Sequence, residues 1–88
     1  MRTIEIDITN IQTVKALHIY LAWKLDMPAH YGRNLDALHD VLGECGADMH
    51  IVLRGEAAGG QMAAYLPRLQ DVLTDCAGEG IIGGYTRQ

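Results

Sequence analysis

Three short apolar segments alternate with longer helical patterns along the 88 residues, and this order limits the sheets that the chain can form. Residues 3–9 place an isoleucine at every second position, with Glu5 and Asp7 between them, which is typical of a strand with one solvated face. Ile51-Val52-Leu53 is a continuous apolar run that suits a strand covered on both faces or flanked on both edges. A last extended segment is predicted to begin at Ile81-Ile82 and to be weakened by the two glycines that follow.

Two helices are predicted between the first and second strands. Thr13 suits the N-cap of a helix that runs to about Asp26, and Pro28 ends it because the residue before a proline avoids the α region. Asn34 suits the N-cap of a second helix that runs to about Leu42–Glu44. The first helix is apolar beyond its core stripe, so we expect two of its faces to be covered. The residues concerned are Ile19, Tyr20, Ala22 and Trp23.

A Gly/Ala-rich connection, Arg54–Gly60, follows the second strand. Gln61–Leu66 is predicted as a short helical turn, and Pro67 fits the first position of a final helix that runs to about Ala77. Helical crossovers between strands imply a parallel sheet, and right-handed crossovers in the order 1-2-3 place all helices on one face. We therefore predict one two-layer α/β domain over residues 1–88, with a three-stranded parallel sheet and three to four helices on one face.

Composition narrows the classes of partner. The formal net charge of −4 argues against nucleic acid as a direct ligand, because phosphate binding needs clustered lysine and arginine. Cys45 and Cys76 lack the spacing of a disulfide framework or a zinc site, and nothing indicates a cofactor. No signal peptide is recognisable and no apolar run approaches the ~20 residues of a membrane span, so we expect a cytoplasmic protein without a membrane partner.

The second predicted helix presents an acidic face. Asp36 and Asp40 are four residues apart and therefore project side by side, with His39 next to them. Like charges at this spacing destabilise a helix by roughly 0.2–0.5 kcal/mol. Asp36 recovers part of that cost because it lies near the positive end of the helix dipole. The pattern favours a cationic partner.

The segment 25–42 resembles the signature of the barstar family, intracellular inhibitors of the bacterial ribonuclease barnase. The resemblance is carried by Pro28, Tyr31-Gly32, Asn34 through Leu38, and Asp40, and it extends more weakly over nearly the whole chain. It implies a three-stranded parallel sheet with helices on one side. It also implies a protein that is not an enzyme, is a monomer when free, and binds one small basic ribonuclease one-to-one.

The same resemblance implies roles for individual residues. Asp40 matches the aspartate that takes the place of the scissile phosphate and meets the catalytic arginines and histidine of the nuclease. His30 and His39 stand where the family's prototype has aromatic residues, as Cys45 does, and indicate smaller and more polar contacts with a different nuclease of similar kind. Asp36 matches a second helix aspartate, and Asp75 matches an acidic position on the last helix. Gly32 and Asn34 match the loop that shapes the entry. The predicted partner-binding residues are His30, Gly32, Asn34, Asp36, His39, Asp40 and Asp75.

Two alternatives stay open at this point. One is a barstar-like interaction module that does not inhibit a nuclease. The other is a metal-dependent hydrolase, because His30, Asp36, His39 and Asp40 are residue types that commonly bind metals. No HExxH-type motif supports the hydrolase, and ligands from one helix and its preceding loop rarely complete a site.

Overall fold

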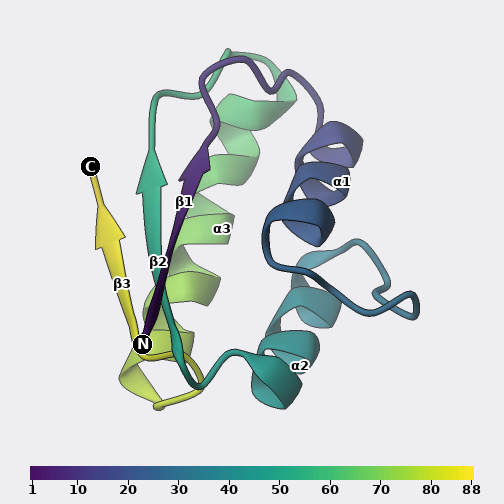
Figure 1. Ribbon diagram of the computed structural model, residues 1–88. Helices are drawn as coiled ribbons and strands as arrows, with labels where there is room; N and C mark the ends of the chain where they lie inside the picture. Colours follow the sequence, from purple (N-terminus) through teal and green to yellow (C-terminus); the bar gives the residue numbers. More distant parts are fainter.

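The computed structural model describes all 88 residues, and it shows a three-stranded parallel sheet with three helices (Figure 1). The strands lie in the order β1-β2-β3, with Ile4 opposite Ile51 and Ile51 opposite Tyr85. The predicted fold class and strand order are therefore confirmed. In chain order the elements are β1 (Arg2–Asp7), α1 (Val14–Lys24), α2 (Leu35–Cys45), β2 (Met49–Arg54), α3 (Gln61–Gly78) and β3 (Gly84–Arg87).

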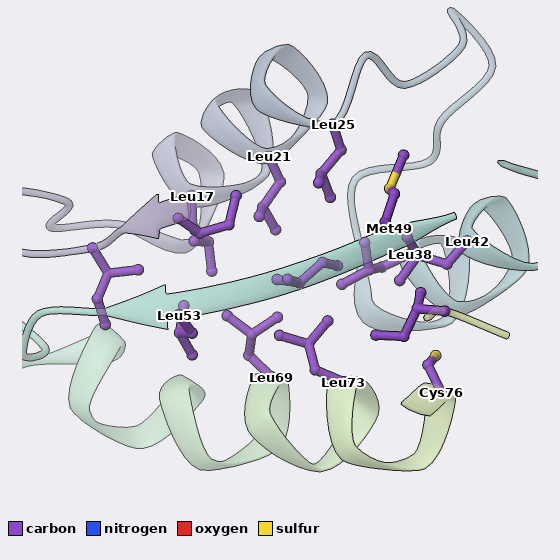
Figure 2. Packing of buried hydrophobic residues seen from close by; sticks show 14 of the residues in the cluster. Leu17, Leu21, Leu25, Leu38, Leu42, Met49, Leu53, Leu69, Leu73 and Cys76 are labelled. Carbon is purple, nitrogen blue, oxygen red and sulfur yellow. The ribbon is translucent and has the colours of Figure 1, made fainter. Parts of the chain in front are cut away.

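One face of the sheet and the apolar faces of all three helices enclose the core (Figure 2). α1 and α2 each contact α3, which they can do only from the same side of the sheet. β2 is the central strand, so its continuous apolar run is explained by a neighbour on each edge. Side chains from three helices converge on the region of β2: Leu17 and Leu21 from α1 and Leu25 from its C-cap, Leu38 and Leu42 from α2, and Leu69 and Leu73 from α3.

α3 differs from its prediction because it is one helix with Pro67 inside it. The expected helix start at Pro67 is wrong. A proline in a helix interior removes a hydrogen bond and costs about 3 kcal/mol. Met62 and Leu66 lie before the proline and are both buried, and burying such side chains contributes roughly 1.5–3 kcal/mol each. The burial of this first part of α3 offsets the cost of the proline.

β3 begins later than predicted because the end of α3 takes up the preceding residues. Gly80 has φ +75°, and the N–H of Ile81 donates to Cys76 O at 2.9 Å, which is the Schellman arrangement that closes a helix. Ile82 is buried at this turn rather than in the strand. β3 therefore starts at Gly84, three residues beyond the predicted start.

Gly84 does not weaken β3 in the way that its sequence suggests. The imidazole of His50 on β2 lies against this glycine, and a Cβ there would be 2.5 Å from His50 Nδ1. The other ring nitrogen, Nε2, is hydrogen-bonded to Thr86 Oγ1 at 2.7 Å. The glycine therefore leaves room for a cross-strand contact between the two strands.

The expectation that a second face of α1 is covered is wrong for Ile19 and Trp23, whereas Tyr20 and Ala22 are partly buried against the core. Ile19 is 48% exposed and Trp23 is 75% exposed. α1 packs on β1 and α3, and no further element lies over its opposite side. Trp23 is flanked by Tyr20, at a ring separation of 6.4 Å, and by the ammonium of Lys24, and it borders a shallow surface pocket with residues of β1.

The loop between α1 and α2 is tied to the interior by one buried hydrogen-bonded chain. His18 is fully buried, and its Nδ1 is hydrogen-bonded to the hydroxyl of Tyr31 from the loop. Its Nε2 lies 2.7 Å from the hydroxyl of Tyr65 on α3. A neutral imidazole has one donor and one acceptor nitrogen, so two hydroxyls satisfy it completely. This chain fixes the loop that leads into α2.

Acid should weaken this arrangement, because burial lowers the pKa of His18. The unfolded chain takes up the histidine proton near pH 6.5, whereas the folded chain takes it up only at lower pH. The free energy of unfolding should therefore fall as the pH drops below about 6.5, by at most about 1.4 kcal/mol per pH unit. Urea unfolding at pH 7.5 and 5.5 measures this slope.

His18→Gln is the test variant, because glutamine keeps a donor and an acceptor but does not titrate. We expect it to flatten the pH dependence of stability. His50→Gln is the matched control and should keep the wild-type slope, since His50 lies on the other face of the sheet. The same slope in wild type and His18→Gln would contradict this assignment.

Pro67→Ala should stabilise the chain, by an amount on the order of 1–3 kcal/mol. The substitution restores a backbone donor in the interior of α3 and removes the clash of the proline ring with the preceding turn. Pro67 is exposed, so no core packing is lost. A lower thermal midpoint for Pro67→Ala than for wild type would show that the proline has a structural role that the helix geometry does not reveal.

Candidate partner-binding surface

α2 has a defined start, because Asn34 caps it. Asn34 Oδ1 accepts a hydrogen bond from the N–H of Ala37 at 2.8 Å, and its Nδ2 donates to Gly32 O at 3.3 Å. The predicted N-cap is therefore confirmed. A Cβ at Gly32 would lie 3.1 Å from the Cβ of Ala37, so the loop passes close to the first turn of the helix. These two predicted site residues shape the entry to α2.

Three carboxylates form a stripe along α2. Asp36, Asp40 and Glu44 are spaced four residues apart, all three are exposed, and α2 contains no lysine or arginine. Asp36 lies in the first turn, where the helix dipole favours a negative charge. Asp36 and Asp40 form no ion pair within the chain. Both are therefore available to a cation from another molecule.

His39 connects α2 to the end of α3. Its Nε2 lies 3.6 Å from Glu79 Oε1, and the imidazole is about half exposed. Glu79 caps α3, and its N–H donates to the carbonyl of Asp75 at 2.9 Å. Asp75 is exposed one turn earlier on α3 and makes no ion pair or hydrogen bond with α2 through its side chain. The structure thus joins His39 to the end of α3 that carries Asp75.

His30 lies beside Glu44, the last carboxylate of the stripe. This residue belongs to the loop before α2, and its Nε2 is 3.5 Å from Glu44 Oε2. Both side chains are more than half exposed. The loop therefore folds back toward the C-terminal turn of α2, and Figure 1 shows it extending away from the sheet beside that helix.

Sequence reasoning missed Glu44 and Glu79, the two carboxylates that meet the predicted histidines. The sequence could have identified Glu44 as part of the acidic face, because it continues the four-residue spacing of Asp36 and Asp40. Glu79 had a weaker one, as it follows Asp75 by four residues beyond the end of the predicted helix. The pairing of His39 with Glu79 depends on how α2 packs against α3, which no local pattern contains.

Cys45 adds little to this surface. It is half-buried, and its Sγ donates to the carbonyl of Val41 in the same helix at 3.3 Å. Burial raises the pKa of this thiol, and that of Cys76 in the core, so neither is a favoured nucleophile. Neither cysteine forms a disulfide.

The hydrolase alternative finds no ligand set in this arrangement. No three histidine, cysteine or acidic side chains converge as a metal site would require. His30 and His39 each face a different glutamate, one on α2 and the other at the end of α3. The surface is suited to binding cationic groups through separate carboxylates rather than to holding one ion.

None of the three helices is both long enough and apolar enough to span a lipid bilayer.

Two comparisons with known proteins show what the chain is similar to. Over 42 residues the chain is 52% identical to a protein of Bacillus subtilis (strain 168) named "Putative ribonuclease inhibitor YrdF". That match covers 48% of this chain and 46% of the relative, so the chain spans about half of the relative's length. The profile of a family described as "Barstar (barnase inhibitor)", whose members are inhibitors and not enzymes, matches residues 1–82. The chain therefore belongs to the Barstar family.

Proposed function

We propose that the chain binds one small basic ribonuclease, one-to-one, and blocks its active site with α2. Asp40 takes the place of the RNA phosphate at the point of cleavage, and Asp36 binds beside it. The observation that carries the proposal is the pair of exposed aspartates without intramolecular partners on a capped helix, in a chain of the Barstar family.

The chemistry of the two carboxylates suits this role. A ribonuclease stabilises the phosphate in its transition state with cationic side chains, and an inhibitor that contains no RNA can satisfy these only with anions. Carboxylate and phosphate both offer paired oxygens that match the fork of an arginine guanidinium. An acidic face also speeds the encounter with a basic cleft.

Preorganisation supports the same proposal. The cap at Asn34, the close passage of Gly32 and the anchored Tyr31 all fix the loop and the first turn of α2 before a partner arrives. Little conformational entropy is then lost on docking. His30, His39 and Asp75 border the acidic stripe and provide polar contacts around it.

The free protein is a monomer in this proposal and acts without a cofactor, in the cytoplasm of the cell that makes the nuclease. The family description names barnase, and the relative's name refers to a ribonuclease. The test is co-expression with a panel of small basic ribonucleases, scored by rescue of growth and followed by the mass of the purified complex. Rescue with a one-to-one mass supports the proposal. An interaction module without inhibition would bind a protein from the panel and fail to rescue.

The aspartates should differ in their effect on inhibition. We expect Asp40→Ala to weaken binding to the inhibited ribonuclease by about 2 kcal/mol or more, which is roughly 30-fold. Asp36→Ala should weaken it less, because Asp36 lies one turn away from the proposed phosphate position. The measurement is the inhibition constant of each purified variant.

Glu56→Ala is the matched control for both variants. Glu56 is also an exposed carboxylate, but it follows β2 at the end of the sheet away from α2. Its removal should leave the inhibition constant within about threefold of wild type, because long-range charge effects are screened at physiological salt. Equal losses from Asp40→Ala and Glu56→Ala would refute the assignment of the site.

A further inference from the structure

A groove lies beside the acidic stripe, between the start of α1, the loop before α2, and α3. Asp36 lines this groove together with Arg33, Tyr65 and Arg68. The chain has only seven lysines and arginines against eleven acidic residues, and two of the seven meet here. The surface proposed to meet a basic nuclease therefore has a cationic flank.

Neither arginine forms an ion pair or a hydrogen bond in the chain. Four ion pairs form in the structure, and none of them includes Arg33 or Arg68. Neither guanidinium makes a hydrogen bond, whereas Arg87 donates three to backbone carbonyls. Both arginines are exposed, and both stand beside Asp36 without pairing to it.

Contacts with one buried chain support Arg68 and the loop that carries Arg33. The Cζ of Arg68 lies 5.5 Å from the centre of the Tyr65 ring, an arrangement that attracts a cation to the ring face. The hydroxyl of Tyr65 is fixed by His18, which also holds Tyr31, two residues before Arg33. One buried chain therefore supports both sides of the groove.

The backbone of Arg33 is in the left-handed region, with φ +57°. This conformation is unfavourable for a residue that carries a side chain, and glycine would adopt it without strain. The chain nevertheless has an arginine here, directly before the cap of α2. A strained residue at a binding surface is an indication that its side chain is needed there.

We propose that this groove takes a carboxylate side chain of the ribonuclease, located on the rim of the basic cleft that receives Asp40. The inference rests on the proposed function. Two unpaired guanidinium groups next to Asp36 would repel a basic cleft unless an anion of the partner met them. The groove then decides which nucleases are accepted, since one with a neutral or basic rim meets uncompensated positive charge.

The test is the sign of a change in affinity. The probe is the ribonuclease of the co-expression panel that the wild-type chain inhibits most strongly. The test variant is Arg33→Gln/Arg68→Gln, and the control is Lys24→Gln/Arg54→Gln, which removes the same charge outside the groove. If the arginines meet a carboxylate, the groove variant binds at least about tenfold more weakly, and the control binds as tightly as wild type or more tightly.

The opposite result overturns the inference. If the groove arginines only face solvent near a basic cleft, neutralising them should make the chain bind the ribonuclease more tightly, as is expected for the control. A groove variant that inhibits as well as wild type or better, while Asp40→Ala loses inhibition, refutes the carboxylate and leaves the proposed function intact. A wild-type chain that inhibits no nuclease of the panel overturns both.

Arg33→Gly separates binding from folding. Glycine relieves the left-handed backbone, so the thermal midpoint should not fall, while affinity should drop because the guanidinium is lost. Wild-type affinity for Arg33→Gly would exclude Arg33 from the contact. The charge-reversed Arg33→Glu/Arg68→Glu should lose inhibition and regain it against a nuclease in which one rim carboxylate is replaced by lysine. Failure to regain it with every rim carboxylate replaced in turn would contradict the proposal.

Discussion

The buried chain Tyr31–His18–Tyr65 is the interaction on which the candidate surface depends. It joins the loop before α2 to α1 and α3 through one imidazole, in a small protein whose other side-chain hydrogen bonds are mostly exposed. Without it the loop would be held mainly by its two ends, and the cap at Asn34 would have to fix the direction of α2 alone. A polar group in a core is costly unless it is satisfied, and here both nitrogens have partners. The core thereby determines where charges lie on the surface.

The arrangement of those charges is unfavourable for the free chain. The stripe on α2 gathers three carboxylates, with Glu44 near the negative end of the helix dipole. Of the three, only Glu44 has an ion-pair partner, His30, and this interaction is long and exposed, so it contributes little. Arg33 and Arg68 are equally unpaired on the other side of Asp36. The proposed partner, with a basic cleft and an acidic rim, would complement a surface that carries separate unpaired charges of both signs.

Local chemistry made much of this molecule predictable from its sequence. Thr13 and Asn34 cap the first two helices as expected, because capping depends on a side chain and an N–H three residues away. The parallel sheet followed from the order of strands and helices. The predictions for Pro67, Trp23 and β3 were wrong because each depends on tertiary packing. The burial of Met62 and Leu66 keeps Pro67 inside one helix, and no element covers α1 at Trp23. The turn at Gly80 delays the start of β3. The contact of Glu79 with His39 and the groove beside Asp36 could not be predicted for the same reason, because both depend on packing against α3. The exposure of Asp36 and Asp40 on one helix could be read from local spacing, whereas the contact of His39 with Glu79 at the end of α3 could not.

The central claim is that α2 occupies the phosphate position of a ribonuclease active site. Competition with a mononucleotide that binds this active site tests it most directly. We expect the apparent dissociation constant of the chain for the ribonuclease to rise in proportion to nucleotide concentration. Asp40→Ala should lower the affinity of the chain for the ribonuclease in the same assay. A ternary complex, with the affinity of the chain unchanged at saturating nucleotide, would show that α2 binds elsewhere and would contradict the account.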